Sequence, residues 1–73
     1  MDKIKTLLEL GFTKENENTY FYDLSKERKI IVDINVVGRV LGDSVFLQQY
    51  ESCVYLCEFN NKDKIDQLIL LLS

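Results

Sequence analysis

The nine residues Lys29–Val37, Lys-Ile-Ile-Val-Asp-Ile-Asn-Val-Val, constrain the fold of this chain more than any other segment. The even-numbered positions are all apolar, whereas the odd-numbered positions include Asp33 and Asn35. Successive side chains of a β-strand point to opposite faces of its sheet, so this alternation predicts a strand. One side of that strand faces a core, and the other side is mixed.

Three other segments are rich in strand-forming residues. The segment 19–24 holds two tyrosines and a phenylalanine, and 44–50 and 53–59 are also predicted strands. The polar stretch 25–28 has the length of a hairpin connection, and a tight turn at 51–52 joins the last two strands. Strands joined by such short connections form an antiparallel meander.

Each end of the chain has the pattern of an amphipathic helix. The segment 2–10 places apolar residues on one helical face, Asp2 can cap its start, and Gly11 can end it in a left-handed conformation. A second helix follows Asn60 or Asn61, either of which can serve as its N-cap, and extends almost to the last residue.

The predicted order is therefore α-β-β-β-β-α in one domain spanning residues 1–73. The simplest packing is a two-layer α+β fold with both helices on one face of the sheet. The alternative places one helix on each face. Two conformations are compatible with the segment after the longest strand. Gly38 can form a bulge within that strand, or it can begin a turn.

The two cysteines do not suggest a disulfide or a metal site. Cys53 and Cys57 are four residues apart on one predicted strand, which separates them by roughly 13 Å, beyond the reach of a disulfide. Two thiols without any histidine are too few for the usual zinc sites. We expect both cysteines to be buried free thiols and the protein to hold no metal.

No pattern of catalytic residues is found in the chain. A serine or cysteine nucleophile usually needs a histidine base, and there is none. If position 23 pairs with position 30 in the first hairpin, Asp23 and Asp33 are offset and do not form an acid–base pair. Gly38 and Gly42 stand between strands, where they cannot form the phosphate loop that precedes a helix. We therefore expect neither enzyme activity nor a cofactor.

Charge and hydropathy bear on the partners and the location. The formal net charge is −3, which disfavours direct binding of nucleic acid. The longest apolar run, 68–72, is far shorter than the ~20 residues that span a bilayer. The first residues lack the pattern of a signal peptide. These observations predict a cytoplasmic protein that does not bind membranes.

Aromatic residues occur at both parities of the predicted strands, so both faces of the sheet carry large apolar side chains. Two short helices on one side leave the other face open, and an exposed apolar face of this size indicates a binding surface. Tyrosine suits such surfaces because it buries a large area at little entropic cost. The predicted interface residues are Tyr20, Tyr22, Phe46, Gln48, Tyr50 and Tyr55.

The segments Leu7–Phe12, Asn18–Tyr22 and Ile30–Ile34 resemble short uncharacterised proteins of phages and mobile elements in low-GC bacteria. The lysine-, asparagine- and isoleucine-rich, proline-free composition is similar too. The resemblance covers the first half of the chain and includes no functional motif. Proteins of that kind often inhibit host defence systems such as CRISPR effectors, by binding a protein or sequestering a nucleotide signal.

Three functions follow as hypotheses. The first is a non-enzymatic module that binds a protein partner or itself, as a homodimer. The second is an oligomer that sequesters a small ligand such as a nucleotide signal, with basic contacts from Lys26, Arg28, Lys29 and Arg39. The third, contact with nucleic acid or its acidic mimicry, is disfavoured by the net charge and by the small number of carboxylates in the central strands.

Overall fold

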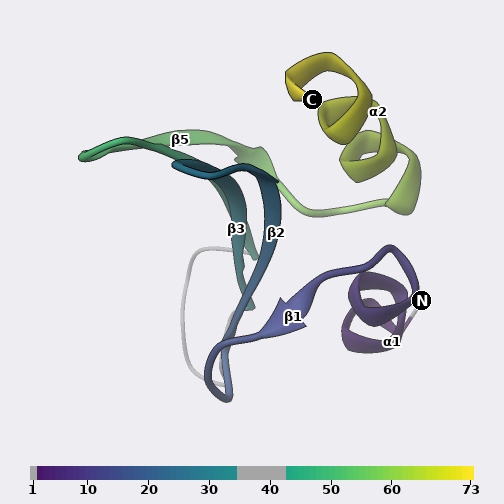
Figure 1. Ribbon diagram of the computed structural model, residues 1–73. Helices are drawn as coiled ribbons and strands as arrows, with labels where there is room; N and C mark the ends of the chain where they lie inside the picture. Colours follow the sequence, from purple (N-terminus) through teal and green to yellow (C-terminus); the bar gives the residue numbers. More distant parts are fainter. Residues whose placement is uncertain (1, 35–42) are drawn as a thin grey trace.

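A computed structural model describes residues 2–34 and 43–73. The elements are α1 (Lys3–Glu9), β1 (Thr13–Lys14), β2 (Thr19–Ser25), β3 (Arg28–Asp33), β4 (Ser44–Gln49), β5 (Ser52–Glu58) and α2 (Lys62–Leu72). The strands form one antiparallel sheet in the order β1-β2-β3-β4-β5, and both helices lie on the same side of it (Figure 1). The predicted two-layer α+β meander is confirmed, with β1 as an added short strand between α1 and β2.

The ends of α1 follow from its sequence. The Asp2 carboxylate accepts a hydrogen bond from the Lys5 backbone N–H at 3.1 Å, which satisfies one of the free donors of the first turn. At the other end Gly11 has a φ of +102°, and its N–H donates to the Leu8 carbonyl. The Phe12 N–H donates to the Leu7 carbonyl, which completes a Schellman cap. The predicted caps of this helix are confirmed.

The second helix begins as predicted from its asparagines. Asn61 is the N-cap, and its side-chain oxygen accepts a hydrogen bond from the Lys64 N–H at 2.9 Å. Asp63 lies in the first turn, where a negative charge is favourable. Ile65 points into the core and is fully buried.

The core lies between the sheet and the two helices. We call the side of the sheet that faces the helices the helix face. Cα pairing aligns Tyr20, Val32 and Val45 in one row across β2, β3 and β4 on this face. The buried core residues are Leu7, Phe12, Tyr20, Ile30, Val32, Val45, Phe59 and Ile65. An ion pair between Lys3 Nζ and the nearly buried carboxylate of Asp43 joins α1 to the start of β4.

Two local predictions differ from the structure, and a third falls on residues that the structure does not describe. The strand β4 ends at Gln49, and Tyr50 lies in the turn with a φ of +56°, where its N–H donates to the Glu27 carbonyl at 2.8 Å. The turn is thus one residue earlier than predicted. Both thiols are free, but Cys53 is exposed and Cys57 is only partly buried, because both lie on β5, the terminal strand of the sheet. The alternatives for Gly38 fall on residues outside the described ranges.

Candidate protein-binding face

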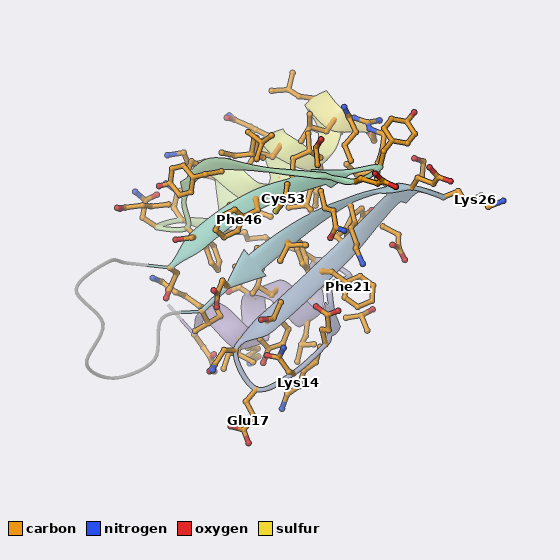
Figure 2. The ribbon with its side chains drawn as sticks, turned by 90° about the vertical axis from the view of Figure 1, so that its left-hand side faces the viewer. Lys14, Glu17, Phe21, Lys26, Phe46 and Cys53 are labelled. Carbon is orange, nitrogen blue, oxygen red and sulfur yellow. The ribbon has the colours of Figure 1, made fainter. Side chains whose placement is uncertain are left out.

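The side of the sheet opposite the helices, here called the outer face, has an apolar row at its centre. Phe21 on β2 pairs with Ile31 on β3, Ile31 pairs with Phe46 on β4, and Phe46 pairs with Tyr55 on β5. We call these four residues the outer row. Figure 2 looks onto this face, with Phe21 and Phe46 on the near side of the sheet and both helices behind it.

Contacts within the outer face order its side chains. The rings of Phe46 and Tyr55 meet edge to face with centroids 5.8 Å apart, a geometry that adds about 0.5–1.5 kcal/mol beyond area burial. Lys29 Nζ lies 5.0 Å from the centroid of the Phe21 ring, within the range of a cation–π contact. The aromatic groups are therefore held in place in the free protein, which lowers the entropic cost of binding through them.

Polar rows flank the outer row on both sides. Toward the start of β4 the paired residues are Thr19, Asp33, Ser44 and Glu58. Toward the hairpin turns they are Asp23, Lys29, Gln48 and Cys53. An apolar centre with a polar rim is the common anatomy of protein–protein interfaces.

The predicted interface residues do not all share this face. Phe46, Gln48 and Tyr55 lie on it, and Tyr55 is 53% exposed. The prediction that Tyr20 lies on an exposed interface is wrong, because Tyr20 is only 2% exposed and belongs to the core. Tyr22 also lies on the helix face, with its ring 5.4 Å from that of Phe12.

A register shift in the first hairpin explains this correction. At the turn Ser25 pairs with Arg28, as expected for a two-residue connection, but an irregularity between Asp23 and Ser25 shifts the pairing by one residue. Asp23 therefore pairs with Lys29 and not with Ile30. A slip of one residue moves every side chain of a strand to the other face, so the two tyrosines of β2 face the core.

The same shift places Phe21 on the outer face beside Ile31, and the sequence prediction included neither residue in the interface. The sequence shows that Phe21 alternates with Tyr20 and Tyr22, and Ile31 with Ile30 and Val32, so each lies on the opposite face of its strand from these neighbours. What the sequence did not contain was a sign of the bulge that aligns the two residues across β2 and β3.

A second candidate site lies where the two hairpin turns meet. The hydrogen bond from Arg28 Nε to Gln49 Oε1, at 3.0 Å, and that from Tyr50 N–H to Glu27 hold the turns together. Between them is an open pocket of about 710 Å³, here called the hairpin pocket. Its lining residues are Asp23, Lys26, Glu27, Arg28, Lys29, Gln48, Tyr50, Glu51 and Ser52.

The hairpin pocket gathers three of the four basic residues predicted for ligand binding, namely Lys26, Arg28 and Lys29, together with the exposed ring of Tyr50. The fourth, Arg39, is outside the described residues. Three carboxylates line the same pocket, so its formal charges balance. This lining suits a ligand with both positive and negative groups better than a simple anion.

Residues 2–34 and 43–73 contain no group of three or more potential metal ligands. No helix in this part of the chain is long and apolar enough to cross a bilayer.

No protein-family model, curated protein or solved structure matches this chain. The chemistry of its own surfaces is therefore the basis for assigning a function.

Proposed function

We propose that this protein is a non-enzymatic binding module that docks on a protein partner through the outer face. The observation that carries the proposal is the outer row, four large apolar residues paired across β2 to β5 on the side of the sheet opposite both helices. Ordered aromatic residues at the centre of a polar rim have the chemistry of binding hot spots.

The partner class follows from the sequence resemblance. Short phage and mobile-element proteins often act by binding a component of a host defence system. We propose a cytoplasmic host protein of that class as the partner, with an apolar patch that covers Phe46 and Tyr55. The net negative charge of this chain favours a partner that is not strongly acidic.

The test compares two residues of the same strand that point to opposite faces. Tyr55 on the outer face and Val54 on the helix face are 53% and 55% exposed. Threonine is compatible with a strand at both positions. The wild-type protein, Tyr55→Thr, Phe46→Thr and Val54→Thr are each used as bait in a host lysate, and captured proteins are quantified by mass spectrometry.

A protein captured by the wild type and by Val54→Thr, but at least tenfold less by Tyr55→Thr and Phe46→Thr, supports the proposal. Equal capture by all four baits would show that the outer face does not bind the partner. Circular dichroism confirms that each variant is folded.

The hairpin pocket supports a second candidate function, in which the protein sequesters a small ligand such as a nucleotide signal. The observation in its favour is that three of the predicted basic residues and Tyr50 line one pocket. A ring for stacking beside positive groups is suited to a base and its phosphates. A rise of the melting temperature with a cyclic nucleotide, absent in Tyr50→Ala, is the expected result. A panel of cyclic nucleotides without any shift removes this candidate.

A further inference from the structure

We propose that the free edge of β5 pairs with the β5 edge of a second copy, so that two five-stranded sheets join into one. This inference goes beyond the proposed function, because it concerns the edge of the sheet and not its outer face. In the sheet order β5 is the terminal strand. Among the described residues, its ladder hydrogen bonds go to β4 alone. Its peptide groups on the other side are available to a further strand.

The first part of the β5 edge, Ser52–Tyr55, lacks the features that usually protect an edge strand, which β5 has only near its end, in Glu58 and the register shift after Tyr55. Charged residues, proline and bulges prevent edges from pairing with other chains. The residues 52–57 contain neither charge nor proline. The register shift in β5 lies beyond Tyr55, so Ser52–Tyr55 remain a regular strand. The opposite edge differs, because β2 is partly covered by β1 and carries Asp23.

Apolar side chains flank this edge on both faces. Val54 is exposed on the helix face and Tyr55 on the outer face. A neighbouring copy can therefore gain apolar contacts above and below the strand pair, in addition to its hydrogen bonds.

Charge and symmetry select a second copy as the occupant. A two-fold axis perpendicular to the sheet makes the β5 strands antiparallel and keeps all helices on one side. In an antiparallel pair, residues directly opposite each other point to the same face of the sheet. The two-fold axis must therefore pass beside one residue that lies opposite the same residue of the second copy, and near the middle of the edge this residue is Cys53 or Val54. In neither register does Glu51 face Glu51 or Glu58 of the second copy. The edge is thus free of like-charge repulsion against itself.

This pairing also extends the proposed binding face. Because the axis keeps both outer faces on the same side, Tyr55 of each copy lies opposite Glu51 or Cys53 of the other, and the two outer rows are offset along the strands. The dimer then presents two apolar rows on one side of the joined sheet. Two copies of one face in fixed geometry would increase the avidity for a partner that is itself symmetric.

The first test is the mass of the native particle, measured by light scattering across a range of concentrations. We expect twice the chain mass of 8.6 kDa for the wild type. Val54→Lys places a charge in the middle of the paired edge and should give a monomer. Leu8→Lys is the matched control, because Leu8 on α1 is 52% exposed and Val54 is 55% exposed, and it should remain a dimer.

The second test uses the native thiol of the edge. In Cys57→Ser, Cys53 is the one remaining cysteine. The two Cys53 residues of the dimer are opposed or offset by two positions, which places their Cα atoms within about 8 Å. A short bismaleimide should therefore link the two copies efficiently, and the link should be lost in Cys57→Ser combined with Val54→Lys.

Three results would overturn the proposal. One is a wild-type monomer at millimolar concentration. Another is a dimer that survives Val54→Lys and is not linked through Cys53, because its interface then lies elsewhere. The third is a wild-type protein that is monomeric and binds a host partner, where Val54→Lys abolishes that binding. In that case a strand of the partner, and not a second copy, pairs with the edge. Failure of the outer-face proposal is separate, because Phe46→Thr leaves the edge unchanged and should still give a dimer.

Discussion

The two faces of the sheet carry apolar rows that are one residue apart, yet they have different roles. On the helix face, Tyr20, Val32 and Val45 are almost completely buried beneath the helices. On the outer face, the outer row keeps part of its surface exposed and is bordered by charged and polar rows. Apolar composition alone thus does not distinguish a core row from a binding row. The position of the helices and the polar rim distinguish them.

The largest predicted effect comes from neighbouring isoleucines of β3 that point to opposite faces. Ile30→Ala removes a fully buried side chain and should lower the free energy of unfolding by about 2–5 kcal/mol. Ile31→Ala, on the outer face, removes a partly buried side chain and should lower it by about 1–2 kcal/mol. Urea denaturation of both variants measures the difference.

Because a core of this size contributes about 3–5 kcal/mol, Ile30→Ala should lose much of its stability and unfold at a far lower urea concentration than Ile31→Ala. Equal losses of unfolding free energy for Ile30→Ala and Ile31→Ala would mean that the outer face is as well covered as the helix face. That result would contradict the difference between the two faces.

An intermediate effect is expected at the end of α1, which covers the helix face. Gly11→Ala places a side chain at a φ of +102° and a Cβ atom 3.3 Å from the Tyr22 ring. The left-handed conformation alone costs about 1–2 kcal/mol for a residue with a side chain. The variant should lose about that much stability in thermal denaturation, whereas Leu8→Ala, in the exposed part of the same helix, should lose less than about 0.5 kcal/mol.

The smallest effect is expected for a contact within the outer face. Lys29→Ala removes the cation–π contact with Phe21, which is worth about 0.5–1 kcal/mol at an exposed site. Lys29→Arg should retain it. If the contact also orders the Phe21 ring for binding, Lys29→Ala should weaken capture of the partner by more than it changes the midpoint of denaturation. An unchanged capture would show that this ordering does not contribute.

Much of the fold could be predicted from local patterns. The caps at Asp2, Gly11 and Asn61 and the alternation along β3 depend on neighbouring residues only, and the structure confirms them. The candidate site was predicted less well. Phe46, Gln48 and Tyr55 lie on the outer face, but Tyr20 and Tyr22 do not, and Phe21 and Ile31 were missed.

The sequence by itself determined the two helices, the four longer strands, their order and the alternation within each strand, because these depend on backbone preferences and spacing within one segment. The tertiary structure alone decided which parity of β2 faces the helices. That choice depends on an irregularity between Asp23 and Ser25, which shifts the register of β2 against β3 by one residue. Register is a relation between strands, so the alternation within one strand cannot specify which of its faces is covered.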